Sequence, residues 1–265
     1  MTARTFLVSG LLAGLIAGLA AFAVAFVVGE PQVETAIGLE ESAAAPAGAE
    51  SDHAHAPGTP AEHSHGDEDA AVSRTVQSTI GLLTGNLAVG VALGGLVGLA
   101  SAGAVGRLGR LTPRQSTGLV AAVGFVGFAL VPFLKYPATP PAVGSGDTIG
   151  DRTALYFAFV AISLAAAVVA VLVGRRIAAS SGAYLGLVAG VSAYLVVVMV
   201  AGTLMPTVNE VGDFPADTLW FFRRASLLVL ATMWAALGLA LAGLIGREHD
   251  KAVAVQRRRE LATSL

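Results

Sequence analysis

Long apolar stretches alternate with short polar segments along almost the whole chain. Six stretches each have roughly the 20 residues that a helix needs to cross the hydrocarbon core of a bilayer. They are residues 6–28, 79–102, 117–134, 153–173, 183–205 and 225–245. Backbone polar groups must bond to one another inside lipid, so these stretches are predicted to be helices. The pattern predicts an all-α fold, a polytopic integral membrane helical bundle with six transmembrane helices.

Composition supports the same class. The 265 residues are 55% hydrophobic and only 13% charged, whereas about 25% of a soluble domain is charged. Residues 1–265 are therefore predicted to form a single membrane domain. The chain has no cysteine, which excludes disulfides and thiolate metal sites.

The lysines and arginines predict an orientation. With six spans and the N-terminus inside, eleven of the 16 basic residues fall on the cytoplasmic side. This predicts a multi-pass protein of the cell membrane in an N-in/C-in arrangement, with a basic cytoplasmic tail at 246–265. A five-span interpretation, which leaves out the short third stretch with Pro132, would place the arginines at 257–259 outside. The first stretch also resembles a signal peptide, but it stays apolar as far as Val28, which favours an uncleaved helix.

Glycines recur every four positions on several of the apolar stretches. Such faces let helix backbones approach closely in lipid, so they predict tight helix–helix interfaces. The series are Gly10, Gly14 and Gly18; Gly81 and Gly85; Gly90, Gly94 and Gly98; and Gly186 and Gly190.

The longest polar segment, 29–78, is predicted to be a largely disordered loop outside the membrane. Its beginning, 29–41, is compatible with a short amphipathic helix. The loop carries two His-x-His pairs beside acidic residues. In extended backbone, residues i and i+2 project to the same side, so each pair can offer two imidazoles to one divalent metal ion. The candidate ligands are His53, His55, His63, His65, Asp52 and Glu62. The alternative is a solvated polar linker that binds metal incidentally.

A second candidate group lies where polar segments meet the predicted outer membrane edge. Glu30, Asn209 and Glu210 supply oxygen ligands there, and charges near membrane depth indicate a functional site. These three residues are predicted to receive the metal from the loop. The alternative is structural: Arg223 or Arg224 pairs with Glu210 or Glu30, or extends to the lipid headgroups.

Motifs for other functions are missing from the sequence. It contains no phosphate-binding Gly-rich loop with lysine, no His-Glu-x-x-His and no Gly-x-Ser-x-Gly. The basic residues mark one membrane face and do not form a patch for nucleic acid. The chain is therefore predicted not to be an enzyme, to bind no nucleic acid and to hold no permanent cofactor.

Several distinctive runs together carry a family resemblance. They are Gly29-Glu30-Pro31-Gln32-Val33, Lys135-Tyr136-Pro137-Ala138-Thr139-Pro140-Pro141-Ala142-Val143-Gly144, Asn209-Glu210-Val211, and Leu219-Trp220-Phe221 with Arg223-Arg224. In these runs the chain resembles the CbtA family of cobalt transporter subunits. The resemblance implies Co²⁺ uptake for cobalamin synthesis and a small single-span partner, CbtB. The family is commonly described with five spans, and it has asparagine where this chain has Thr139.

The leading hypothesis is inward transport of a divalent transition metal, Co²⁺ with Ni²⁺ as a further candidate. The alternative is a non-transporting metal sensor or assembly scaffold in the membrane. Histidine and carboxylate ligands bind cobalt, nickel and zinc alike, so the choice among these metals stays open.

Overall fold

A computed structural model describes residues 1–44 and 72–264. All regular structure within these residues is helical, and they contain no β-strand. Six helical segments are long and apolar enough to cross a membrane, which confirms the predicted six-helix class. They are Ala3–Ala43, Arg74–Ala104, Pro113–Lys135, Gly146–Ser181, Ala183–Leu204 and Ala216–Thr263.

Three of these segments contain a π-helical turn between two α-helical parts. The first runs through α1 (Ala3–Val24), η1 (Ala25–Gly29) and α2 (Glu30–Ala44). The second runs through α3 (Arg74–Val76), η2 (Gln77–Gly81) and α4 (Leu82–Ala104), and the third through α5 (Pro113–Gly124), η3 (Phe125–Leu130) and α6 (Val131–Lys135). The remainder are a 3₁₀ turn η4 (Gly146–Thr148), α7 (Ile149–Ser181), α8 (Ala183–Leu204) and α9 (Ala216–Thr263).

Local signals account for several helix starts. Thr112 caps α5 in a reciprocal capping box with Gln115, and Pro113 occupies the first turn, where its missing N–H costs nothing. Pro132 lies in the first turn of α6, directly after η3. The third helical segment therefore continues through its proline and is long enough to cross a membrane, which favours six spans over five.

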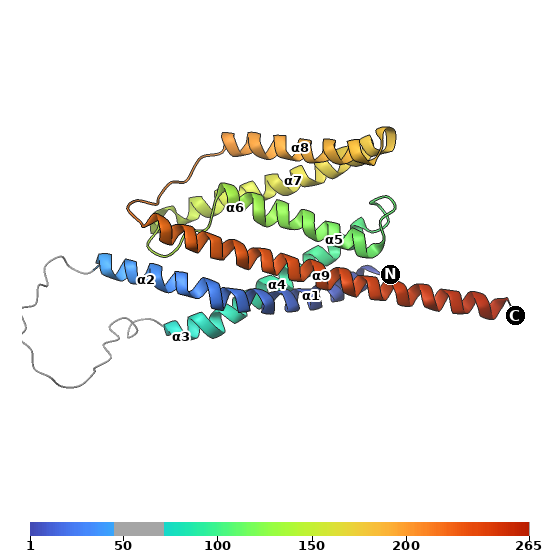
Figure 1. The fold of residues 1–265 in the computed structure, drawn as a ribbon, viewed down its shortest axis with the longest axis horizontal. Helices are drawn as coiled ribbons and strands as arrows, with labels where there is room; N and C mark the ends of the chain where they lie inside the picture. Colours follow the sequence, from blue (N-terminus) through green and yellow to red (C-terminus); the bar gives the residue numbers. More distant parts are fainter. Residues whose placement is uncertain (45–71, 265) are drawn as a thin grey trace, which may run out of the picture.

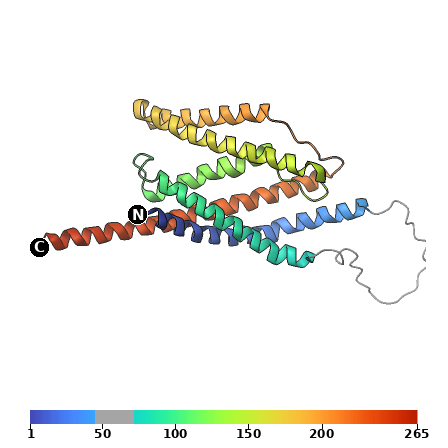
Figure 2. The same cartoon turned by 180° about the vertical axis from the view of Figure 1, so that it is seen from behind.

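The helices run side by side and nearly along one direction (Figure 1). Helices α1, α4, α5 and α9 pack around one apolar core, which contains Phe6, Leu93, Trp234 and Leu237. Helices α7 and α8 form a hairpin beside this group, and Figure 2 shows the same arrangement from behind. Both chain ends lie at one end of the bundle, while α2 and α3 point to the other. Which of these ends faces the cytoplasm stays a prediction from the arginines.

The first and the last helical segments extend furthest beyond their predicted spans. The first span continues through α2 as far as Ala44, so the beginning of the predicted loop is helical. Helix α9 has 48 residues, or roughly 70 Å at 1.5 Å per residue, which is more than twice the thickness of a hydrocarbon core. Its last turns form the basic tail, which projects past the bundle (Figure 1).

Glycines hold α1 and α4 in direct backbone contact. A Cβ built on Gly18 would lie 2.7 Å from the carbonyl oxygen of Asn86, and one on Gly90 would lie 2.5 Å from that of Gly14. This confirms the predicted close packing for the first and third glycine series. Gly85 has open space where its Cβ would be, so the prediction was wrong there and this part of the helix needs no small residue.

A buried hydrogen bond joins the two helices of the outer hairpin. The hydroxyls of Ser163 on α7 and Tyr194 on α8 lie 2.8 Å apart. We expect Tyr194→Phe to lower the free energy of unfolding by about 1 kcal/mol, because a hydroxyl in an apolar surrounding loses its partner. A double-mutant cycle with Ser163→Ala checks this. Fully additive effects of the two substitutions would contradict a direct bond.

Candidate functional site

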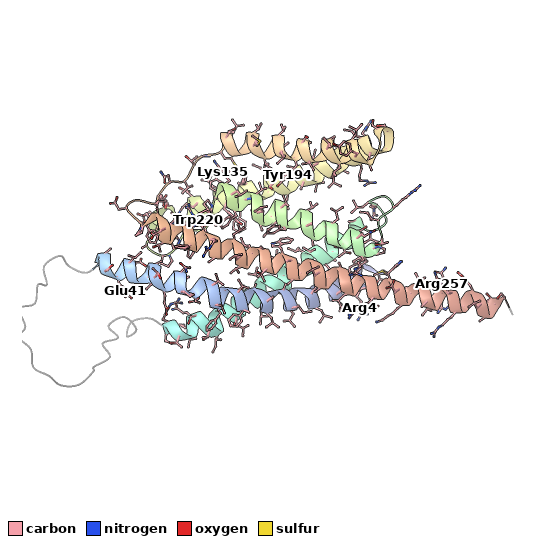
Figure 3. All side chains as sticks on the ribbon, in the orientation of Figure 1. Arg4, Glu41, Lys135, Tyr194, Trp220 and Arg257 are labelled. Carbon is pink, nitrogen blue, oxygen red and sulfur yellow. The ribbon has the colours of Figure 1, made fainter. Side chains whose placement is uncertain are left out.

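A cavity of about 850 Å³ lies at the end of the bundle opposite the two termini. Its walls come from the start of α2, from α6, α7 and α9, and from the segments 136–143 and 208–211. Figure 3 places Lys135 and Trp220 toward this end, and Arg4 and Arg257 toward the other. The cavity therefore lies at the end where residues 44 and 72 lead to the histidine segment.

The π-helical turns stand next to charged residues of this region. Turn η1 ends directly before Glu30, η2 begins three residues after Arg74, and α6 ends at Lys135 shortly after η3. A π-turn adds one residue to a helical turn and so rotates everything that follows it. Turns η1 and η3 both pack against α9. The rotation sets the direction of Glu30 and Lys135, both of which line the cavity.

Glu30 forms an ion pair with Arg74. The guanidinium of Arg74 donates a hydrogen bond from Nη2 to Oε2 of Glu30, whose side chain is only 16% exposed. The pair joins the first residue of α2 to the first residue of α3. It therefore ties together the two helices between which the histidine segment lies.

Glu210 has a more elaborate set of partners. Its Oε2 lies 3.6 Å from Nε of Arg152, and it accepts hydrogen bonds from the Thr148 hydroxyl at 2.8 Å and the Ser145 amide at 3.3 Å. Gly144 has φ +93°, and a Cβ there would overlap the Arg152 guanidinium. Glycine at 144 thus allows both the turn and the close approach of the arginine.

The proline-rich segment after α6 is held against the segment after α8. Nζ of Lys135 donates to the carbonyl of Met205 at 3.2 Å, and the Tyr136 hydroxyl donates to that of Pro206 at 2.8 Å. Desolvation raises the pKa of the Tyr136 hydroxyl above its ordinary value, so it stays a donor over the physiological range. These two bonds position the loop that carries Glu210.

Two of the three predicted oxygen ligands belong to the wall of the cavity. Glu30 and Glu210 line the same cavity, whereas Asn209 is exposed and lies outside the lining. Within residues 1–44 and 72–264, no group of three or more histidine or acidic side chains is placed to hold a metal ion. The remaining predicted ligands lie outside the described residues; they are His53, His55, His63, His65, Asp52 and Glu62.

The carboxylates do have arginine partners, but not the predicted ones. Arg74 and Arg152 hold Glu30 and Glu210, in place of Arg223 and Arg224. In the sequence, Arg74 and Arg152 contribute to the predicted orientation and to the family resemblance, and neither predicts an ion pair. Their position directly before an apolar stretch, where a charge needs a partner, was the available sign of this role.

The fold and the cavity define a class: a multi-pass α-helical membrane protein with charged groups gathered at one end. A comparison with protein families is more specific. The family model described as "Probable cobalt transporter subunit (CbtA)" matches residues 3–246. The chain therefore belongs to the CbtA family, as its sequence runs predicted. Searches of curated proteins and of solved structures found no match.

Membership of this family indicates where the chain works and with what kind of partner. The chain belongs with transporter subunits, so it is a membrane protein that works with partner subunits. The match spans all six apolar helices and the cavity residues, and it stops at 246, before the last turns of α9.

Proposed function

We propose that this chain moves a divalent transition metal inward across the cell membrane, and that the metal is Co²⁺ for cobalamin synthesis. The histidine segment captures the ion outside, Glu30 and Glu210 receive it with Asn209 nearby, and the bundle passes it inward. A small CbtB-like subunit is the proposed partner. The observation that carries the proposal is the cavity with two acidic residues at the end of the bundle where α2 ends and α3 begins, in a chain of this family.

The ion pairs set a condition on this pathway. Each carboxylate is occupied by an arginine, so a metal ion can bind Glu30 or Glu210 only where Arg74 or Arg152 moves away. A doubly charged ion attracts a carboxylate about twice as strongly as a guanidinium at the same distance. This stronger attraction offsets part of the cost of removing water from the ion, and the arginines released by the exchange become part of the proposed transport cycle.

The membrane potential can supply the driving force. A potential of 100 mV, negative inside, favours inward movement of a divalent cation by roughly 4.6 kcal/mol, twice the single-charge value. Nucleotide hydrolysis is not required under this proposal.

The test is isotopic cobalt accumulation in cells that carry or lack the chain, with and without the small partner. We expect accumulation to fall on deletion and to return with the full chain. Unchanged accumulation, together with an altered metal response, would favour the alternative of a membrane metal sensor or assembly scaffold.

Replacing His53, His55, His63 and His65 together is expected to reduce uptake several-fold when cobalt is scarce, with little effect when it is abundant. Neutral imidazole binds metal, so capture is present above about pH 6.5 and weakens as the pH falls through that value. Uptake measured from pH 5.5 to 7.5 checks this, with His249 on α9 replaced as the control. A quadruple variant with the pH profile of the wild type would contradict a capturing role.

A further inference from the structure

The cavity carries more positive than negative side chains. Lys135, Arg152 and Arg223 line it, against Glu30 and Glu210. Both acids already have an arginine partner, because Glu210 pairs with Arg152 and Glu30 with Arg74. Within the part of the chain that the structure describes, Lys135 and Arg223 therefore have no acidic partner.

The contacts of these two cations leave most of their donors unused. Lys135 gives one hydrogen bond to the Met205 carbonyl and lies 5.4 Å from the centre of the Tyr136 ring, and Nε of Arg223 gives one hydrogen bond to the Ala138 carbonyl at 3.5 Å. An ammonium has three N–H donors and a guanidinium has five. Both side chains are half-buried, where an uncompensated charge is costly. The cavity thus offers a cationic surface that fits an anion.

The rest of the wall is mostly apolar, and an exposed tryptophan at this end of the bundle indicates the level of the lipid headgroups. Phe133, Val143, Phe222 and Leu230 contribute to the wall. Trp220, 64% exposed, lies toward the same end of the bundle as Lys135 (Figure 3). Exposed tryptophans of membrane proteins concentrate at the headgroup level. An anion that binds here meets hydrocarbon as well as positive charge.

We propose that this cavity binds a phosphate diester carried on hydrocarbon chains, the headgroup region of an anionic phospholipid, with Lys135 and Arg223 as its charged contacts. Arginine presents a fork of donors that matches phosphate geometry, and lysine acts as a point charge. A volume of about 850 Å³ lies within the usual range for pockets of small ligands. The bound phosphate would also cancel positive charge in the path of a cation, but the proposal does not depend on metal transport.

The test measures lipid retention by the purified full chain. Native mass spectrometry after addition of phosphatidylglycerol or phosphatidylcholine compares the wild type with Arg223→Gln, Lys135→Gln and Arg224→Gln. Arg224 is the matched control, because it is adjacent and exposed, stacks 4.9 Å from the Phe221 ring and does not line the cavity. We expect Arg223→Gln and Lys135→Gln to weaken phosphatidylglycerol binding about tenfold each, the effect of one lost charge-assisted hydrogen bond. Arg224→Gln should bind as the wild type does.

Several outcomes would overturn the proposal. Equal losses in the Arg223 and Arg224 variants would show general attraction to headgroups. Equal retention of both lipids would show that the cavity does not select a headgroup with net negative charge. Displacement of phosphatidylglycerol by millimolar inorganic phosphate would show that free phosphate, and not a phospholipid, is the ligand of this site. Arg223→Lys, which keeps the charge and should keep most binding, guards against a variant that fails to fold. Lipid binding is measured on the purified chain, so the result of the cobalt uptake experiment neither supports nor contradicts this proposal.

Discussion

Gly94→Leu is expected to prevent the chain from assembling its folded bundle. A Cβ at Gly94 would overlap the carbonyl oxygen of Gly10 and lie 2.8 Å from the Cα of Gly14. Both contacts are backbone atoms of α1, which cannot rotate away as a side chain can. Helices α1 and α4 would have to separate, and α1 also packs against α9. The smaller change Gly94→Ala should lower the free energy of unfolding by about 1–3 kcal/mol.

Gly85→Leu is the matched control for this experiment. It lies on the same helix, α4, and a Cβ added there would meet no atom within 4 Å. We expect it to behave as the wild type in yield of monodisperse protein and in thermal unfolding followed by tryptophan fluorescence. A Gly94→Leu variant as stable as Gly85→Leu would contradict the backbone contact between α1 and α4.

Replacing Glu30 and Glu210 together by glutamine is expected to reduce cobalt uptake at least about tenfold at limiting metal. Glutamine keeps the size of the side chain but removes the negative charge that attracts a divalent cation. It also leaves Arg74 and Arg152 unpaired, which raises the positive charge of the cavity. Isotopic uptake at several cobalt concentrations measures the effect. Glu34→Gln on α2 and Asp213→Asn provide controls, since both residues are exposed and do not line the cavity.

A second pair of variants separates a metal ligand from a structural ion pair. Glu30→Gln combined with Arg74→Gln removes both members of the pair and leaves no unpaired charge. If Glu30 serves only to hold Arg74, this double variant regains the uptake that Glu30→Gln loses. We expect uptake to stay low, because the carboxylate itself receives the metal. Recovery to the wild-type rate would contradict that role.

The helical bundle could be predicted because lipid leaves so few alternatives. An apolar stretch of sufficient length must satisfy its backbone internally, and this gave six helices, including the span that contains Pro132. Helix ends were harder to predict. Helix α2 continues through polar residues as far as Ala44, and α9 continues to Thr263, where hydropathy no longer marks a boundary.

The side-chain partners of the site could not be read from the sequence. Glu30 and Arg74 belong to different helical segments, and their pairing depends on how the helices pack and on the rotation that the π-turns introduce. Glu210 lies in the segment between α8 and α9, whereas Arg152 lies on α7, so this pairing depends on how that segment folds back over the helix. Sequence reasoning placed Glu30 and Glu210 at one membrane edge, and they do share one cavity. It could not distinguish the inward-facing Glu210 from the exposed neighbour Asn209, because both lie in an irregular segment without a helical or strand period.

Voltage-driven cobalt uptake by right-side-out membrane vesicles tests the central claim most directly. A potassium gradient with valinomycin sets a potential that is negative inside, and isotopic Co²⁺ is supplied outside without nucleotide. Vesicles that contain this chain and its partner should accumulate cobalt in proportion to the imposed potential, and the Glu30 and Glu210 double variant should not. Accumulation equal to that of vesicles lacking the chain, at every potential, would contradict inward transport through this protein.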